Sequence, residues 1–274
     1  MIWGVAFVAQ RQGMAYIGPL AFNAIRFALG TLSLLPVFLL MRSRMPTPDR
    51  KTLIVGSAWT GVILFCAAFL QQIGVAYTTA GKAGFITGLY VVLVPILGLG
   101  LGHRTGRWTW LGVVSAVIGL YLLTVTESFT IEQGDLYVRV GAFFWAVHLH
   151  LLAAYAPRIG AIRLALIQFI ICSAISFGAM MMFETTRIEN VTDAALPILY
   201  TGILSVGVAY TLQVIGQTDA PPAQAAIILS LETVFAVVGG WLILSETLDV
   251  RGATGCALMF AGMIVSQLDG KPSE

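Results

Sequence analysis

Long apolar stretches fill the chain, separated by short breaks that are polar or rich in glycine and proline. Apolar and polar residues do not alternate within these stretches, and each stretch is about twice as long as the strand of a membrane β-barrel. A helix that crosses a bilayer needs roughly 20 apolar residues. The pattern therefore predicts an all-α polytopic membrane protein with ten transmembrane helices, at residues 1–16, 19–41, 52–75, 81–102, 108–125, 137–155, 161–183, 194–217, 222–244 and 250–267.

The two halves of the chain resemble each other in a constant register. Residues 70–74 recur at 212–216 with four identical positions, a shift of 142 residues. The same shift relates further identical pairs: Trp3–Trp145, Ile17–Ile159, Gly18–Gly160, Ile25–Ile167, Phe27–Phe169 and Leu89–Leu231. If each half holds five spans, the second half starts from the opposite side of the membrane. We therefore expect two inverted repeats, residues 1–126 and 134–268, with a binding site where they meet near the bilayer midplane.

The composition is that of a protein whose main partner is the lipid bilayer. Of the 274 residues, 58% are hydrophobic and 10% are charged, whereas soluble domains have ~25% charged residues. The net charge of +2 gives no reason to expect a nucleic-acid partner. The three cysteines, Cys66, Cys172 and Cys256, have neither disulfide nor metal-ligand spacing, and we expect no metal or cofactor. The chain opens directly into an apolar segment, so we expect no cleavable signal peptide.

Basic residues in the short loops predict the orientation. Lysine and arginine gather in the loops after the second, fourth and sixth predicted spans, at Arg42, Arg44, Arg50, Lys51, Arg104, Arg107 and Arg158. The loop after the fifth span instead carries Glu127, Glu132 and Asp135 before any basic residue. Short cytoplasmic loops are enriched in lysine and arginine. We therefore expect the basic loops and both termini to be cytoplasmic in a bacterial inner membrane.

The first predicted span is unusually short. A helix over residues 1–16 is ~24 Å long, against a hydrocarbon core of ~30 Å. Local bilayer thinning would accommodate such a helix. We prefer the interpretation that the first span is truncated and that its native start lies upstream of Met1.

Several motifs resemble those of one transporter family. The run from Trp3 to Arg11 resembles the first-helix signature of EamA-type carriers in the drug/metabolite transporter superfamily. Further similar runs are 16–19, 24–27, 231–235 and 245–248, together with Pro95 and the spaced glycines Gly112, Gly119, Gly255 and Gly262. Thr233 stands where the family usually has proline and does not impose proline's kink. The resemblance implies ten helices in two inverted repeats and movement of small metabolites, commonly export.

Glu232 is the most informative single residue. It lies in the middle of the ninth predicted span, where a charge costs ~2.5–3.5 kcal/mol even on the permissive insertion scale. The carboxyl group must face a cavity or a partner, or be protonated. One interpretation is a proton-coupling or substrate-contacting group, and the other is a buried hydrogen-bonded clamp between the repeats. Its repeat mate is Tyr90, so we expect these two side chains to face a cavity lined by spans 1, 3, 4, 6, 8 and 9.

Other polar residues are weaker candidates. Gln71 and Gln213 are repeat mates that either bind substrate or hydrogen-bond neighbouring helices. Arg11 and Arg26 lie toward the outer ends of the first two spans, and there they either attract an anionic group or serve as anchors, with Arg26 able to extend outward to water. Arg139, at the outer start of the sixth span, has the same two interpretations, with the anchor favoured.

Aromatic residues and histidines complete the candidate site. Trp3, Phe7, Tyr90 and Trp145 either line a cavity for an amphipathic solute or simply pack. His148 lies one turn from Trp145, although we prefer to interpret it as a hydrogen-bonded core histidine. His148 and His150 point about 200° apart on a helix, which argues against a shared metal ion.

The sequence carries no catalytic or phosphate-binding motif. We therefore expect a secondary transporter, not an enzyme, that moves a small-molecule substrate by alternating access as a monomer or homodimer. A proton-coupled or gradient-driven exporter is preferred. A passive facilitator or channel of the same fold is the first alternative, and a membrane-embedded enzyme or scaffold is the second.

Overall fold

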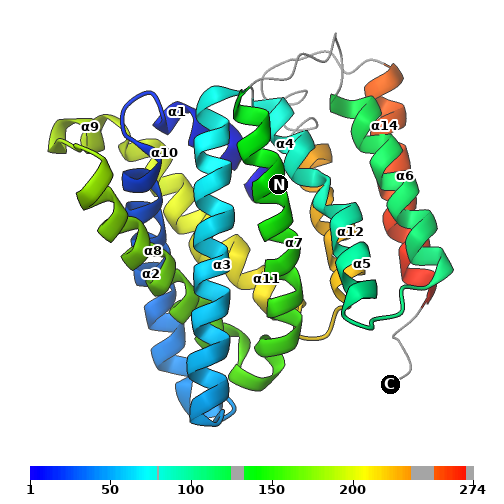
Figure 1. Ribbon diagram of the computed structural model, residues 1–274, viewed down its shortest axis with the longest axis horizontal. Coiled ribbons are helices and arrows are strands. Elements are labelled where there is room, and N and C mark those ends of the chain that lie inside the picture. Colours follow the sequence, from blue (N-terminus) through cyan, green and yellow to red (C-terminus); the bar gives the residue numbers. More distant parts are fainter. Residues whose placement is uncertain (79, 125–132, 236–249, 270–274) are drawn as a thin grey trace.

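The computed structural model describes residues 1–78, 80–124, 133–235 and 250–269, and every regular element in these ranges is a helix (Figure 1). The longer helices are α1 (Ile2–Gly13), α2 (Pro19–Met41), α3 (Arg50–Tyr77), α4 (Ala80–Gly88), α5 (Tyr90–Gly100), α6 (Arg107–Thr124), α7 (Gln133–Ile159), α8 (Ala161–Phe183), η2 (Tyr200–Tyr210), α12 (Pro222–Ser230) and α14 (Val250–Ser266). The short elements are η1 (Arg42–Arg44), α9 (Ile188–Asp193), α10 (Ala195–Leu199), α11 (Thr211–Gly216) and η3 (Gln267–Asp269).

The structure confirms an all-α polytopic membrane protein. Six segments of the described ranges are long and apolar enough to cross a membrane, at residues 19–44, 50–77, 82–100, 133–159, 161–183 and 195–216. The bounds of α2 and α8 agree with the predicted spans, and helices also occupy the other predicted ranges. The end of the ninth predicted span, the acidic residues Glu127 and Glu132, and the motif at 245–248 lie outside the described residues.

Two predicted spans are broken in the middle. The fourth span divides into α4 and α5 at Leu89, and the ninth is interrupted after α12 at Leu231. Both leucines have φ −62°, with ψ −11° at Leu89 and −10° at Leu231. Their amides donate to the carbonyl three residues back, Ile86 and Ile228 respectively, which is a tighter turn than the α-helical one. The break therefore forms without proline at position 233.

The region before the predicted eighth span and the span itself also differ from expectation. Residues 184–193, expected to be a loop, contain the short helix α9. Residues 200–210, expected to be α-helical, form the π-helix η2 between α10 and α11. Close packing accompanies η2, because a Cβ atom at Gly30 of α2 would overlap Val206, and one at Gly202 would lie 2.8 Å from Leu29 Cβ.

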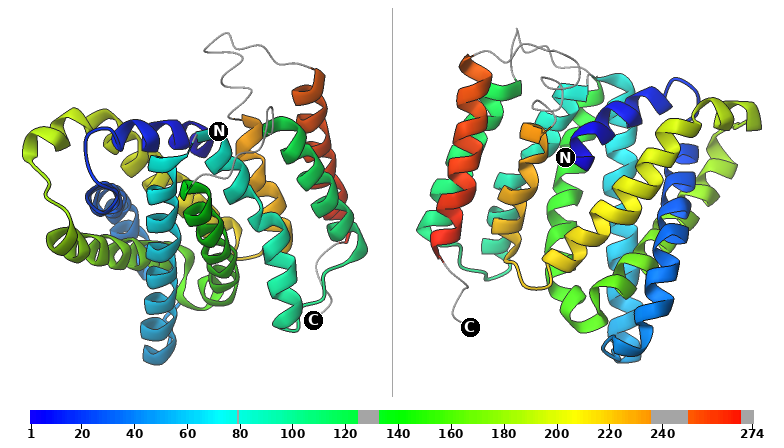
Figure 2. Two further views of the ribbon diagram at one scale, coloured as in Figure 1. Left: turned by 45° about the horizontal axis from the view of Figure 1, so that its top comes forward. Right: turned by 180° about the vertical axis from the view of Figure 1, so that it is seen from behind.

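Helices from opposite halves of the chain pack side by side. In Figures 1 and 2, α6 lies against α14 at one side of the bundle, α3 against α7 in the centre, and α2 against α8 at the other side. A glycine seam joins α6 to α14, where Gly112 faces Gly262 and Gly119 faces Gly255 through backbone contacts. Such small residues let membrane helices approach closely.

The three loops with basic residues lie at one end of the bundle, at the bottom of Figure 1. These loops follow α2, α5 and α7, and we call this end the basic end. At the opposite end, the Glu184 carboxylate accepts hydrogen bonds from the amides of Leu20 and Ala21 at 2.8 and 2.9 Å. It thereby satisfies the free amides at the start of α2, as an N-cap residue would.

Candidate functional site

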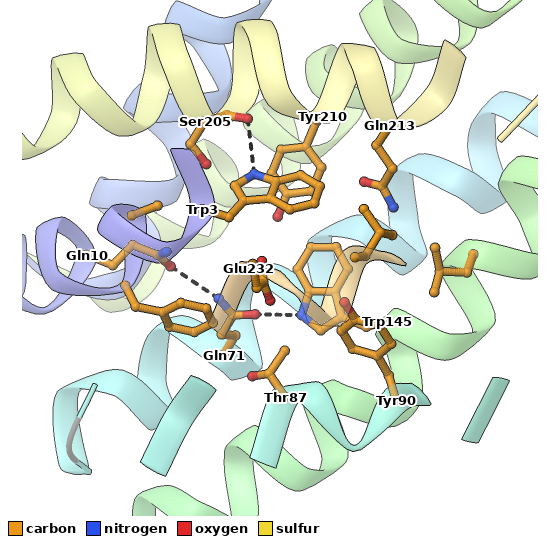
Figure 3. Close-up of a pocket in the computed structure, with 14 residues that line it drawn as sticks. Trp3, Gln10, Gln71, Thr87, Tyr90, Trp145, Ser205, Tyr210, Gln213 and Glu232 are labelled. Atoms are coloured by element: carbon orange, nitrogen blue, oxygen red, sulfur yellow. Dashed lines mark hydrogen bonds between the residues drawn. The ribbon is translucent and has the colours of Figure 1, made fainter. Parts of the chain in front are cut away.

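A central pocket lies between the two halves of the chain (Figure 3). The first half contributes side chains from α1, α3, α4 and α5, and the second half contributes them from α7, η2, α11 and α12 and from the segment after the break at Leu231. The lining residues are Trp3, Ala6, Phe7, Gln10, Gln71, Thr87, Tyr90, Trp145, Leu149, Ser205, Tyr210, Gln213, Leu229 and Glu232. The cavity volume is about 40 Å³, enough for a few water molecules at most.

Seven of the nine predicted site residues line this pocket: Glu232, Tyr90, Trp3, Phe7, Gln71, Gln213 and Trp145. The other two do not. Arg11 is exposed on α1, and His148 is buried, with its Nε2 2.9 Å from Gln168 Oε1. His148 thus has the environment of a hydrogen-bonded core histidine, the preferred alternative.

Sequence reasoning missed several lining residues that lie three positions away from a predicted one. Gln10 lies three residues after Phe7, Thr87 lies three before Tyr90, and Tyr210 lies three before Gln213. Residues three or four apart share a face of a helix. Gln10 therefore shares a face of α1 with Phe7. Thr87 and Tyr90 instead lie on either side of the break at Leu89, and Tyr210 ends the π-helix η2 before α11, which carries Gln213.

The structure corrects the expectation that the Arg26 side chain extends outward to water. Its side chain is 1% exposed and does not extend to water. The guanidinium carbon lies 5.6 Å from the ring centre of Phe22 and 5.1 Å from that of Phe27. Arg26 packs against these two rings and is not among the described residues that line the central pocket.

Gln71 joins α3 to two other helices. Trp145 Nε1 donates to Gln71 Oε1 at 2.6 Å, and Gln71 Nε2 donates to Gln10 Oε1 at 3.4 Å (Figure 3). Its repeat mate Gln213 is less fully paired: the Nε2 atom donates to Gln217 Oε1 at 3.1 Å, whereas Oε1 has no hydrogen-bond partner in the described ranges. The two repeat mates therefore differ in their contacts. Gln71 bridges helices through both ends of its amide, whereas the Gln213 amide oxygen has no hydrogen-bond partner in the described ranges.

Three aromatic rings stack across the pocket. The ring of Tyr210 lies 4.8 Å from that of Trp3 and 5.7 Å from that of Trp145, nearly parallel to the latter at 15°. Trp3 is fixed by a hydrogen bond from its Nε1 to the Ser205 carbonyl at 3.4 Å. Tyr210 of the second half thus contacts two tryptophans that are repeat mates, tilted against Trp3 and stacked with Trp145.

Glu232 follows directly on the helix break at Leu231, and its carboxylate points into the pocket (Figure 3). Tyr90, its repeat mate, also follows directly on a break, at Leu89. Tyr90 and Tyr210 line the same pocket as Glu232. No arginine or lysine is among the lining residues.

A second, larger cavity opens at the basic end. Its volume is about 1020 Å³, and α5, α7, α12 and the loops at 103–106 and 217–221 line it. Gln217 lines this vestibule and donates through Nε2 to the Leu149 carbonyl at 3.3 Å, and Leu149 lines the central pocket. A thin hydrogen-bonded layer that contains Gln213, Gln217 and Leu149 therefore lies between the two cavities.

An ion pair joins α4 to α7 at the opposite end of the described structure. Lys82 Nζ lies 3.0 Å from Asp135 Oδ2, and Thr78 donates to Asp135 Oδ1 at 2.7 Å. Asp135 is fully buried. Here α3 and α7 are also in backbone contact, because a Cβ atom on Gly134 would lie 2.7 Å from the Gly74 carbonyl oxygen. In the described residues, a large cavity thus opens at the basic end, and a buried ion pair lies at the other end.

Residues 1–125 and 132–267 match the EamA-like transporter family. The chain belongs to this family. It is therefore a membrane transporter of the drug/metabolite transporter superfamily rather than an enzyme, as the first-helix motif predicted. The central pocket therefore lies between the two halves of an EamA transporter.

The relatives are transporters by name. An uncharacterized transporter of Archaeoglobus fulgidus is 30% identical over 98% of this chain and 83% of its own length. The transporter YoaV of Bacillus subtilis is 23% identical over 97% and 93%. A "Probable amino-acid metabolite efflux pump" of Salmonella typhimurium is 22% identical over 97% and 91%. A crystal structure with 18% identity covers 98% of this chain and 96% of its own, with a TM-score of 0.76, and shares the fold.

Proposed function

We propose that this EamA transporter is a secondary transporter that exports small organic metabolites across a bacterial inner membrane, driven by the proton gradient. The observation that carries the proposal is Glu232, an acid in the central pocket of a membrane protein. Ionisable groups inside membrane proteins commonly mark substrate and proton pathways. A carboxyl group can take up a proton when the pocket is dry and release it when water enters.

Two inverted repeats, residues 1–126 and 134–268, are part of the proposal. The helix breaks at the repeat mates Leu89 and Leu231, with near-identical dihedral angles, support it. So does the glycine seam, where Gly112 of α6 faces Gly262 of α14 and Gly119 faces Gly255, so that the order of the pairs is exchanged between the two helices. A twofold relation between the halves would produce this exchange. Discontinuous helices at the interface of such repeats commonly form the substrate site.

Alternating access is supported by the difference between the two ends. The vestibule of about 1020 Å³ lies at the basic end, while Lys82 and Asp135 form a buried ion pair at the other end. The second half of the cycle would close the vestibule and separate this ion pair. We propose that each chain carries its own pocket, as a monomer or within a homodimer.

The orientation predicts which loops an impermeant reagent reaches. The basic loops should be cytoplasmic, because lysine and arginine in short loops are retained on that side. We expect a membrane-impermeant maleimide to label Thr185→Cys at the opposite end in intact cells, and to label Ser43→Cys at the basic end only after the membrane is opened. Both positions are exposed, and the variants are made after replacing Cys66, Cys172 and Cys256. Labelling of Ser43→Cys in intact cells would overturn the orientation.

The proposed function is tested with purified protein in proteoliposomes under an imposed pH gradient. The name of the Salmonella relative makes amino-acid metabolites the first solutes to screen. We expect at least one solute to accumulate against its own gradient, and a protonophore to abolish the accumulation. Flux that follows only the solute gradient would instead favour the passive facilitator.

A further inference from the structure

Two of the chain's three histidines meet in the vestibule at the basic end. His103 follows α5 and His150 lies on α7, and both line this cavity of about 1020 Å³. Their ring centres are 5.6 Å apart, with 35° between the ring planes. His103 is exposed and His150 is half-buried. The pair is therefore accessible to protons from the basic end.

The end of α5 fixes the position of His103. The His103 amide donates to the Gly98 carbonyl at 2.8 Å, and the Gly102 amide donates to the Leu99 carbonyl at 3.1 Å. With Gly102 at φ +81°, these two bonds form the Schellman motif that ends a helix at a glycine. Gly98 also leaves room for the rings, because a Cβ atom there would lie 3.3 Å from His150 Cε1 and 3.7 Å from His103 Cβ. The backbone of α5 thus holds the two rings together.

One hydrogen bond determines where His150 takes up a proton. His150 Nε2 lies 2.8 Å from the Val94 carbonyl oxygen. Since a carbonyl oxygen can only accept, Nε2 carries the hydrogen of the neutral ring and Nδ1 is left bare. Nδ1 has no hydrogen-bond partner in the described ranges. A proton added at Nδ1 therefore gives this ring a full positive charge beside the ring of His103.

The surroundings favour one positive charge on the pair but not two. The C-terminal end of a helix such as α5 carries a partial negative charge that favours a nearby cation. Besides His103 and His150, the charged side chains among the described lining residues are Arg104, Asp219 and Asp269. Asp269 accepts hydrogen bonds from backbone amides at the start of α6, which leaves one acid and one base of opposite charge. Two protonated rings in contact would therefore repel each other without an acid to spare.

We propose that His103 and His150 form a pH sensor that slows transport when the basic end is exposed to acid. Histidine is the side chain whose charge ordinarily changes between about pH 5 and pH 8. The contact is intact while the rings are neutral and is lost as the pH falls through this range. Protons bind better to a state in which the rings are apart, so acid shifts the population away from the observed arrangement, in which the rings pack and the vestibule is open.

This inference rests on the proposed function and its orientation, and it names a regulation of the same transport cycle. A proton-driven exporter brings protons into the cytoplasm, which the basic end is proposed to face. A sensor at that end would slow the cycle once the cytoplasm has become acidic. Proton entry would thereby limit itself.

The first test measures a distance across the basic end without any solute. Spin labels are attached at Thr105→Cys, in the loop that carries His103, and at the exposed Ser43→Cys, in the loop after α2. The purified full chain, with its native cysteines replaced, is placed in lipid nanodiscs. The distance distribution is measured by electron paramagnetic resonance at about pH 7.5 and about pH 5.5, toward the two ends of the histidine range. We expect one main distance at the higher pH and a second population that becomes the major one at the lower pH.

Variants identify the groups that respond. His103→Gln and His150→Gln should each remove the second population, because glutamine can still donate to the Val94 carbonyl from position 150 but does not titrate. His148→Gln is the matched control and should keep the response. His148 is the remaining histidine, lies two residues from His150 on the same helix, and is buried outside the vestibule.

The second test measures solute exchange in proteoliposomes with the same pH on both sides. Exchange by the native protein should slow several-fold between the two pH values, and exchange by His103→Gln should slow less. If His150→Gln fails to fold, His103→Gln carries both tests, because His103 is exposed.

Four results would overturn the inference. They are a native distance distribution that does not change with pH, a change that His103→Gln retains, a change that His148→Gln also loses, and native exchange that does not slow. A response that Glu232→Gln removes but His103→Gln keeps would assign the pH dependence to the central acid instead. Transport that proves independent of a proton gradient would refute the proposed function but leave a histidine-dependent distance change intact.

Discussion

Glu232→Gln is expected to abolish accumulation driven by a pH gradient while leaving downhill exchange in place. Glutamine keeps the size of the side chain and its hydrogen bonding but cannot carry a titrating proton. At one proton per solute, a pH difference of one unit supports about tenfold accumulation, and this ratio should fall to about one in the variant. The measurement is solute uptake by proteoliposomes with and without the imposed gradient.

Glu189→Gln is the matched control for this experiment. Glu189 is an exposed acid on α9, outside the central pocket, and its replacement should leave accumulation unchanged. Normal accumulation by well-folded Glu232→Gln protein would refute the coupling role. A Glu232→Gln variant that no longer expresses would indicate a structural clamp, in which case Glu232→Asp, which keeps the titrating group, should not restore proton-driven uptake.

The second large effect is expected at the glycine seam between α6 and α14. A Cβ atom at Gly255 would lie 2.7 Å from the Gly119 carbonyl oxygen and 3.0 Å from the Leu123 amide. Gly255→Val should therefore push the two helices apart. Overpacking of this kind costs roughly 1–3 kcal/mol, and close van der Waals contact is a main source of helix association in lipid.

We expect this variant to lower the thermal midpoint in nanodiscs by several degrees. Gly178→Val is the control, because a Cβ at Gly178, toward the C-terminal end of α8, meets no atom within 4 Å. The control carries the same change in helix propensity from glycine to valine, so the difference between the two variants isolates the packing effect. Equal shifts in both would contradict the proposed importance of the seam.

Hydropathy predicted the positions of the helices well, because lipid imposes a length and an apolar composition that are visible in one sequence. The bounds of α2 and α8 agree with the prediction, and basic or proline-glycine breaks delimit them. The interruptions at Leu89 and Leu231 were not predictable in this way. A leucine whose ψ changes to about −10° leaves the apolar pattern unaltered.

The central pocket was partly predictable from the repeat register. Glu232 stood out because a charge in the middle of a span needs a reason, and its mate Tyr90 followed from the shift between halves. Tyr210 and Thr87 did not stand out, since tyrosine and threonine are ordinary in membrane helices. Arg26 looked able to reach water from its place near a helix end, yet its side chain is enclosed by Phe22 and Phe27, a contact that only the packing of α2 could reveal.

The central claim, that solute movement through this pocket is coupled to protons at Glu232, is tested most directly by measuring proton flux. A pH-sensitive dye is trapped in proteoliposomes, a gradient of a transported solute is imposed without a pH gradient, and the internal pH is followed. The account predicts a solute-dependent pH change with the native protein that a protonophore collapses and that Glu232→Gln lacks. Solute flux at the native rate with no pH change would contradict it and would indicate a passive facilitator.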